Sequence, residues 1–324
     1  MKRFAKKTAV YLIPFLIALL LFYIFEPSNY FGFKDDAAYF TRPLSSMRQL
    51  MREQPANVIF GDSRMANLNT DYIKEITGEE YSMQGFGGAT LGESIELFWF
   101  ATEHTKMEKV MFGVSFYGAK GIQDAGRITD VEKQATNIFA FTSRLDYWLQ
   151  ALNSAKDGSQ NIIADVLNRP DLMAEPPEDP TAFTPQDIPT ERGDRYRLQL
   201  EEYADIIRFM CEGYTLESDT LRQLDEIIDY CKENHIELIF VFPPMHQSIF
   251  TNVTEPMDLD GYRNQLKDYL IGKTTVYDME FLNDFTCNED NFFDGFHLSS
   301  EEKKTLAQLL FTDVAADIIV RHYV

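Results

Sequence analysis

Between residues 57 and 116, three short apolar runs alternate with two stretches of helical periodicity. The apolar runs lie at 57–60, 81–84 and 109–116, and the helical stretches at 71–77 and 90–105. In the longer helical stretch Leu91, Ile95 and Phe98 recur at the spacing of one helix face. This alternation predicts parallel strands joined by right-handed helical crossovers, the arrangement of an α/β protein.

The same alternation resumes after residue 216. Helices are predicted at 218–234 and 255–270, and strands at 237–242 and 275–279. A last helix begins at Ser299, with Glu302 placed to complete a capping box, and its apolar positions run to Ile318. We therefore assign residues 55–119 and 216–324 to one α/β domain.

Residues 120–215 interrupt this pattern and are predicted to form a helical insertion. Its helices are expected at 143–152, 160–167 and 198–211. Residues 170–189 hold six of the thirteen prolines, which excludes regular structure there and favours an exposed loop or lid. Long loops at the strand ends of a sheet often select the substrate, so we expect the insertion to cover the active-site edge. An insertion without such a role is the alternative.

The N-terminus has the features of a membrane anchor. An uncharged apolar run lies at 9–25, and as a helix it spans about 26 Å. Four basic residues precede it: Lys2, Arg3, Lys6 and Lys7. Bulky aromatic residues end this run where a signal peptide needs small ones, so we favour an uncleaved transmembrane signal-anchor. Residues 1–8 are then a cytoplasmic tip, residues 26–54 a connector with a short helix at 44–53, and the main domain lies outside the membrane.

Composition narrows the classes of function. The chain has 51 acidic and 30 basic residues, a net charge of −21, which argues against nucleic-acid binding. Cys211, Cys231 and Cys287 allow at most one disulfide within the chain, and we favour buried thiols. No metal-ligand spacing occurs, and Thr90 replaces the last glycine of a dinucleotide-binding motif, so we predict neither metal nor cofactor.

The apolar run at 57–60 ends abruptly in Gly61-Asp62-Ser63, which predicts a buried strand that delivers a serine to the sheet edge. Of the five histidines, only His297 has an aspartate three residues before it, Asp294. A single turn lets Asp294 accept from His297 Nδ1–H and leaves Nε2 free to take a serine proton. Ser63, His297 and Asp294 are therefore the candidate catalytic triad.

These residues resemble the motifs of the SGNH (GDSL-like) hydrolase superfamily, over roughly residues 55–320 and interrupted by the insertion. Gly61-Asp62-Ser63 matches the nucleophile block, Asp294-Gly295-Phe296-His297 the Asp-x-x-His block, and residues 85–90 the glycine block. The resemblance implies that Gly88 donates its N–H to an oxyanion together with the N–H of Ser63. The third block departs from the family, since Ser115 stands where an asparagine donor is expected; its hydroxyl is the candidate third donor to the oxyanion.

Two further residues are weaker candidates for substrate binding. Arg64 follows the nucleophile and is placed to meet a carboxylate or phosphate, although an arginine in such a position more often pairs with a nearby acid. His246 follows the strand at 237–242, where a solvated loop histidine is an equal alternative.

The fold we expect is a three-layer α/β/α, flavodoxin-like domain with a parallel sheet, a helical insertion and an N-terminal transmembrane anchor. The resemblance is greatest to the membrane-anchored, extracytoplasmic branch, which includes the D-alanyl transfer protein of teichoic acid biosynthesis and polysaccharide acyltransferases. It implies serine-dependent acyl transfer or ester hydrolysis on a cell-envelope glycan or polymer, with an acyl donor and a polytopic acyl-exporting membrane partner. A catalytically inactive scaffold or glycan-binding protein of the same fold is the alternative.

Overall fold

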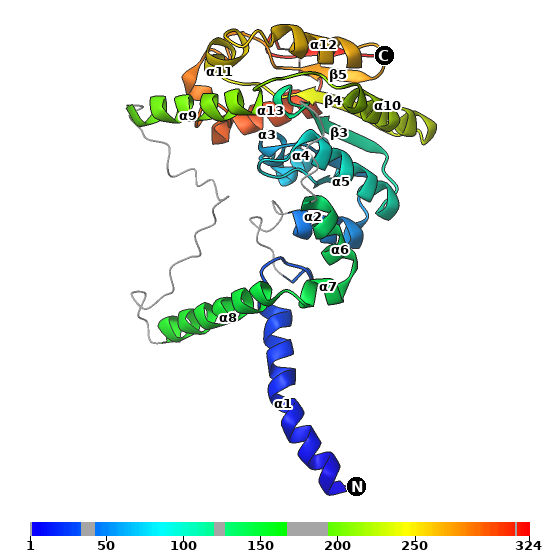
Figure 1. Ribbon diagram of the computed structural model, residues 1–324, viewed down its shortest axis with the longest axis vertical. Helices are drawn as coiled ribbons and strands as arrows, with labels where there is room; N and C mark the ends of the chain where they lie inside the picture. Colours follow the sequence, from blue (N-terminus) through cyan, green and yellow to red (C-terminus); the bar gives the residue numbers. More distant parts are fainter. Residues whose placement is uncertain (1, 34–42, 120–126, 167–193, 315) are drawn as a thin grey trace. The chain divides into compact units, whose positions relative to one another are not determined.

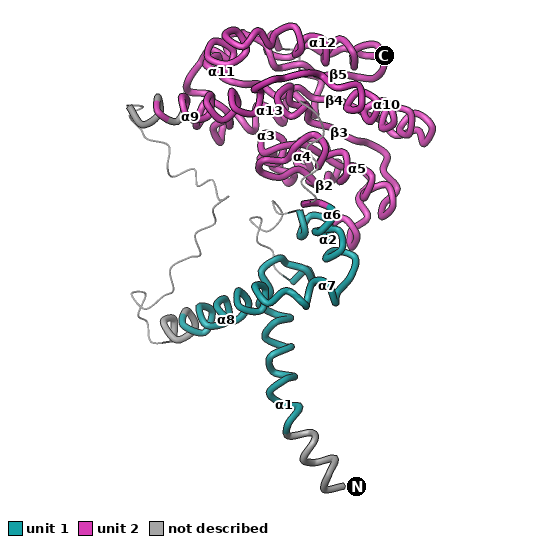
Figure 2. Tube along the Cα trace, in the orientation of Figure 1, with its two compact units in different colours: residues 1–49, 129–182 teal, residues 50–128, 183–324 magenta. Residues whose placement is uncertain are grey.

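The computed structural model describes residues 2–33, 43–119, 127–166, 194–314 and 316–324 (Figure 1). They divide into two compact units, residues 1–49 with 129–182 and residues 50–128 with 183–324 (Figure 2). The insertion expected at 120–215 is shared between the two units. Its proline-rich part, 170–189, lies outside the described residues.

A single sheet organises the second unit. It contains β1 (Asn57–Phe60), β2 (Tyr81–Met83), β3 (Lys109–Gly113), β4 (Glu237–Phe242), β5 (Thr275–Asp278) and β6 (Val320–His322). The strand order is β2-β1-β3-β4-β5-β6, and the first five strands are parallel. The order of these five is that of flavodoxin-like folds, in which the carboxyl ends of the strands flank a crevice beside β1 and β3.

Alternate residues of the central strands enter two different apolar layers. Ile59, Met111 and Ile239 pack with side chains of α4 (Thr70–Thr77) and α13 (Ser300–Phe311) on one face. On the other face the rings of Phe60, Phe112 and Phe240 follow one another, and Phe60 and Phe112 meet Phe98 of α5 (Leu91–His104). Helix α10 (Ser218–Glu233) also contacts α5 and β4. The three-layer α/β/α arrangement predicted from the sequence is therefore present.

Most predicted elements of the second unit are found within a few residues of their expected ends. The remaining ones here are α3 (Ser63–Ala66), η2 (Tyr117–Ala119), α9 (Asp194–Met210), α11 (Gln247–Ile249), η5 (Phe250–Thr254), α12 (Asp260–Leu270) and η6 (Glu289–Asn291). The helix expected from residue 255 begins only at Asp260, because a π-helical turn at 250–254 precedes it.

The C-terminal helix is shorter than expected. Helix α13 ends at Phe311, and the chain then returns as β6, antiparallel to β5. Arg321 of β6 donates to the carbonyl oxygens of Leu309 (2.5 Å) and Thr312 (3.3 Å) at the end of this helix. It thus satisfies carbonyls that would otherwise lack a partner. Ser299 is the N-cap without a side-chain hydrogen bond, so the predicted capping box does not form.

The first unit contains α1 (Lys2–Phe25), most of α2 (Pro43–Glu53) and α6 (Arg127–Thr136), α7 (Ile138–Thr142) and α8 (Leu145–Val166). The sequence predicted two helices where α8 is continuous. Aromatic side chains hold this unit together: Phe22 stacks on Trp148 with ring centroids 4.2 Å apart, and Tyr30 stacks on Phe141 at 4.0 Å.

Helix α1 contains the apolar run in which a transmembrane anchor was expected. Among the residues that the structure describes, no helix has both the length and the apolar character that a membrane span requires. The expected anchor at 9–25 is thus without support from the structure. The three cysteines are free thiols; Cys211 and Cys231 are buried as expected, but Cys287 is exposed.

Candidate active site

The nucleophile candidate lies where β1 turns into the short helix α3. Gly61 has φ +143°, and a side chain there would press against Met65, so only glycine suits this turn. Asp62 is the N-cap of α3, and its side chain accepts from the Arg64 N–H at 3.0 Å. This cap fixes the first turn of α3, and Ser63 begins that turn.

Ser63, His297 and Asp294 form one hydrogen-bonded chain, although 234 residues separate the first two. The Ser63 Oγ lies 2.7 Å from His297 Nε2, and His297 Nδ1 lies 2.7 Å from Asp294 Oδ2. The other Asp294 oxygen accepts from the N–H groups of Phe296 (2.9 Å) and His297 (2.7 Å). The base and its orienting carboxylate therefore form one rigid loop.

The protonation states follow from this geometry. Burial raises the pKa of Asp294, but the hydrogen bonds and charge of His297 and the N–H of Phe296 outweigh it, so the net pKa is lowered. The carboxylate is thus ionised at neutral pH and can only accept hydrogen bonds. Consequently His297 Nδ1 carries the proton, and Nε2 accepts from the Ser63 hydroxyl.

Beside the triad lies a buried cluster of four polar side chains: Asp62, Arg64, Ser115 and Tyr117. Asp62 Oδ2 accepts from Ser115 Oγ (2.6 Å), Tyr117 Oη (2.6 Å) and Arg64 Nη2 (3.0 Å). Burial raises the pKa of Asp62, but the Arg64 charge and these hydrogen bonds lower it to about 2. The cluster therefore contains a buried ion pair whose carboxylate is fully satisfied.

Arg64 does not reach toward a substrate. Its guanidinium pairs with Asp62, donates from Nη2 to Ser115 and from Nη1 to the Pro243 carbonyl at 3.3 Å. With only 5 % of its surface exposed, it lies 4.9 Å from the centroid of the Phe296 ring. The weak prediction of a substrate-binding Arg64 is corrected: the alternative of pairing with a nearby acid is the one the structure shows.

Ser115 also has a different set of partners from those expected. Its single hydroxyl hydrogen is donated to Asp62, and its oxygen accepts from Arg64. In this arrangement no hydrogen remains for an oxyanion. The strand at 109–116 ends at Gly113, three residues earlier than predicted, which lets Ser115 and Tyr117 turn back toward Asp62.

The glycine block is held directly against the nucleophile turn. Phe86 N–H donates to the Gly61 carbonyl at 3.2 Å, and a side-chain carbon at Gly85 would lie 2.8 Å from the same oxygen. Gly88 follows in a turn with φ +68°. Residues 85–88 are therefore fastened to the loop that carries Ser63.

His246 is buried and contacts the loop of residues 294–297, here called the histidine loop. Its Nδ1 accepts from the Ser248 N–H at 3.2 Å, and its own N–H donates to the Gly295 carbonyl at 3.1 Å. The second contact links the segment after β4 to the loop between Asp294 and His297. The expectation that His246 lines the substrate site is therefore replaced by a structural role, and it is not a solvated loop histidine either.

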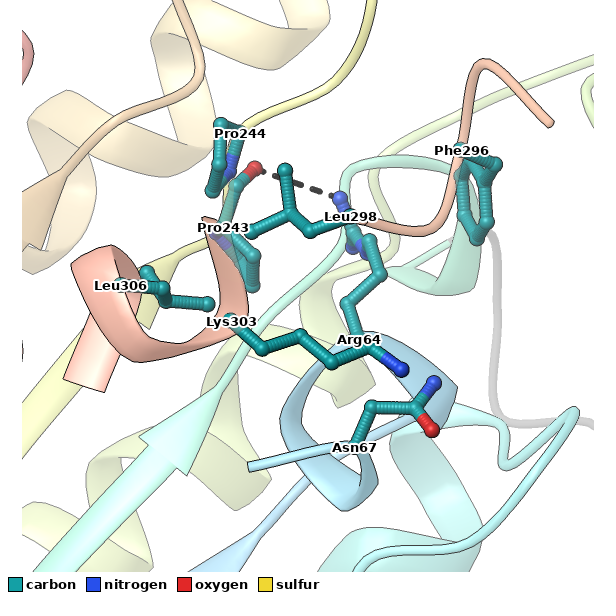
Figure 3. A pocket seen from close by; sticks show the side chains of 8 residues that line it. All are labelled: Arg64, Asn67, Pro243, Pro244, Phe296, Leu298, Lys303 and Leu306. Carbon is teal, nitrogen blue, oxygen red and sulfur yellow. Dashed lines mark hydrogen bonds between the residues drawn. The ribbon is translucent and has the colours of Figure 1, made fainter. Parts of the chain in front are cut away.

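A small pocket lined in part by Arg64 has room for about one water molecule (Figure 3). Its lining residues come from the nucleophile helix, the end of β4, the histidine loop and α13: Arg64, Asn67, Pro243, Pro244, Phe296, Leu298, Lys303 and Leu306. Burial lowers the pKa of Lys303, although the Asp294 charge opposes this shift. Across the described parts of the chain, no group of three or more His, Cys, Asp or Glu side chains is arranged to hold a metal.

The order of the parallel strands is that of the flavodoxin-like α/β/α domain expected from the sequence. No protein-family model matches the chain. No curated protein matches its sequence either.

Two solved structures are similar to it. A candidate acylhydrolase from Bacteroides fragilis is 14% identical with TM-score 0.40, over 86% of this chain and 96% of that protein. A candidate platelet activating factor from Streptococcus pneumoniae is 11% identical with TM-score 0.41, over 82% and 88%.

Sequence reasoning missed the residues that support the triad. Tyr117 donates to Asp62, and Tyr203 stacks on Phe296 and meets the ring of His297. Tyr117 follows Ser115 by two residues, so its position after a central strand was a usable signal. Tyr203 belongs to the insertion and had no local signal, because only the packing of α9 brings it here.

Proposed function

We propose that this protein is a serine-dependent esterase or acyltransferase with Ser63 as its nucleophile. The observation that carries the proposal is the hydrogen-bonded chain from Ser63 through His297 to Asp294. His297 Nε2 lies 2.7 Å from Ser63 Oγ, and Nδ1 lies 2.7 Å from Asp294 Oδ2. A hydroxyl held against a neutral imidazole that a buried carboxylate orients is the arrangement that activates serine for attack on a carbonyl carbon.

The first half-reaction forms an acyl-enzyme. Ser63 Oγ bonds to the acyl carbon while its proton moves to His297 Nε2, and Asp294 stabilises the resulting imidazolium. The backbone N–H groups of Ser63 and Gly88 are the proposed donors to the oxyanion. His297 then gives its proton to the departing alcohol oxygen as the ester bond breaks.

The second half-reaction releases the acyl group. A water molecule or an acceptor hydroxyl loses its proton to His297 and attacks the acyl carbon, and Ser63 leaves with that proton restored. Hydrolysis and transfer therefore differ only in which hydroxyl attacks.

Turnover of an aryl acetate by the full-length protein tests this proposal. We expect measurable hydrolysis that Ser63→Ala lowers by at least about 10³-fold, and Asp294→Asn by roughly 10³- to 10⁴-fold. A fluorophosphonate probe should label the wild-type chain and leave the Ser63→Ala variant unlabelled. Equal turnover by wild type and Ser63→Ala would refute the catalytic proposal and favour a scaffold or glycan-binding protein.

We further propose that the acyl acceptor is a cell-envelope glycan or polymer, and that the chain acts at the outer face of a membrane. Support comes from the motif resemblance and from helix α1, where large apolar side chains are exposed, among them Tyr11 (81 %), Phe15 (59 %) and Leu16 (58 %). Such a surface is suited to contact with lipid.

Flotation of the full-length protein with lipid vesicles tests the membrane contact. We expect the wild type to float and the Phe15→Glu/Leu16→Glu variant to stay in the soluble fraction. Phe209→Glu, at a residue 77 % exposed on α9, is the matched control and should float like wild type. Flotation that is unchanged by the α1 substitutions would contradict the proposal.

A further inference from the structure

Helix α9, from the insertion, packs onto the strand-end region of the second unit. Its buried residues Ala204 and Ile207 join an apolar cluster with side chains that follow β3 and β4 and with the histidine loop: Phe116, Tyr117, Met245, Ile249, Phe250 and Phe296. Helix α9 also contacts η2, α11 and η5. The outer side of the same helix exposes Phe209, so its two faces have different roles.

Tyr203 is the residue of α9 that reaches the triad. Its ring stacks on Phe296 with centroids 5.9 Å apart and planes 9° apart. The same ring meets His297 at 5.8 Å with planes 82° apart. Phe296 in turn packs on Tyr117 at 5.7 Å and lies against Arg64. Tyr203 thus contacts both the candidate base and the residue before it.

We propose that Tyr203 is a positioning residue, which holds the His297 imidazole so that Nε2 faces Ser63 and whose hydroxyl acts on the Asp294 carboxylate. This inference rests on the proposed function, because it assigns a role within the same triad. No residue of the insertion was expected to touch the catalytic groups themselves.

The geometry explains what each part of the tyrosine contributes. Asp294 restrains His297 through Nδ1, which leaves the imidazole some freedom to tilt. The ring of Tyr203 lies nearly perpendicular to the imidazole and limits that tilt, because a tilted imidazole would press against the closely packed Tyr203 ring.

The hydroxyl of Tyr203 acts through charge. Burial, followed by the charge of Asp294 and a hydrogen-bonding interaction with it, raises the pKa of Tyr203. The phenol therefore remains protonated and able to donate. A donor to Asp294 withdraws part of the negative charge that stabilises the His297 imidazolium.

Among the described residues, few other charged or titratable groups lie near Tyr203, His297 and Asp294. Ser63 of α3 meets His297 directly, and Lys303 of α13 interacts with the charge of Asp294. Glu202 of α9 interacts with the charge of Tyr203. Substitution of Tyr203 leaves all three in place, so a shift in the His297 titration would report on the tyrosine.

Two variants separate the ring from the hydroxyl. Tyr203→Ala removes both, and we expect kcat for an aryl acetate to fall about tenfold or more with a much smaller change in KM. Tyr203→Phe keeps the ring and should restore most of kcat. Because it removes the hydroxyl that interacts with Asp294, it should move the acidic limb of the kcat/KM profile to higher pH.

Phe209→Ala is the matched control, since it truncates an aromatic residue on the outer side of the same helix. We expect it to leave kcat, KM and the pH profile at wild-type values. Thermal melts of all variants identify any that fail to fold. Tyr203→Ala kinetics equal to those of Phe209→Ala would overturn the proposal, as would a rise in KM alone, which would indicate a substrate-contact surface.

An NMR titration of the His297 imidazole separates this proposal from the proposed function. We expect Tyr203→Phe to raise the pKa of His297 above its wild-type value, whether or not the protein turns over an ester. Retained activity in Ser63→Ala would refute the proposed function while leaving this measurement valid. Loss of activity in Ser63→Ala with an unshifted His297 titration in Tyr203→Phe would overturn the role of Tyr203 alone.

Discussion

The hydroxyl of Tyr117 donates a 2.6 Å hydrogen bond to the Asp62 carboxylate, which immediately precedes the candidate nucleophile. The same carboxylate oxygen binds Ser115 and Arg64, so the residue before Ser63 is the centre of a buried polar cluster. That cluster, rather than the apolar core alone, fixes the turn between β1 and α3. Several measurable consequences depend on it.

Removal of the Asp62 charge should destabilise the fold. In Asp62→Asn the buried Arg64 loses its counter-charge, and breaking a buried ion pair in this way costs roughly 3–5 kcal/mol. Urea denaturation followed by circular dichroism measures the free energy of unfolding. Asp146→Asn, in an exposed ion pair with Arg144, is the control and should change it little. Equal effects of the two substitutions would contradict the role given to Asp62.

The same carboxylate predicts loss of stability in acid. Its folded-state pKa of about 2 lies below 3.8, the ordinary value for an aspartate, so its contribution to stability is present above about pH 4. It is lost as the pH falls through about 2, and a pKa difference of this size corresponds to about 2 kcal/mol of stability. The free energy of unfolding, measured between pH 5 and pH 2, should fall more steeply for the wild type than for Asp62→Asn. Parallel curves would show that other groups carry the effect.

Ser115→Ala tests the assignment of the oxyanion donors. Because the Ser115 hydrogen is donated to Asp62, its loss should lower stability by about 1 kcal/mol and reduce kcat only a few-fold. Loss of a true oxyanion donor lowers kcat by about 10²- to 10³-fold. Steady-state kinetics with an aryl acetate distinguish the two. A decrease of 10²-fold or more at unchanged stability would assign Ser115 to the oxyanion hole after all.

Gly85 and Gly87 provide a matched pair in the glycine block. A side-chain carbon at Gly85 would lie 2.8 Å from the Gly61 carbonyl oxygen, whereas one at Gly87 would meet nothing within 4 Å. Gly85→Ala should therefore push residues 85–88 away from the nucleophile turn and cost about 1–3 kcal/mol of stability, with a loss of activity. Gly87→Ala should leave both properties near wild type. Thermal unfolding and kinetics of the two variants check this, and equal behaviour would count against the tight contact.

The sequence by itself determined the order along the chain of the five parallel strands and of the helices between them. Apolar runs at 57–60, 109–116 and 237–242 are long enough for buried parallel strands, and local periodicity identifies the helices between them. It also indicated that Ser63 and the pair Asp294 and His297 share one edge, because parallel strands deliver their carboxyl ends to the same side. Each of these inferences depends only on neighbours in the chain.

Tertiary structure alone decided what surrounds that edge. The partners of Arg64 and Ser115 are set by the meeting of chain segments about 50 residues apart, and no local pattern encodes that choice between solvent, substrate and Asp62. The pairing of β6 with β5 and the contact of Tyr203 with His297 likewise arise from packing between distant segments. Hydrogen bonds and ring contacts require atoms within a few ångströms, and only the folded chain brings those atoms together.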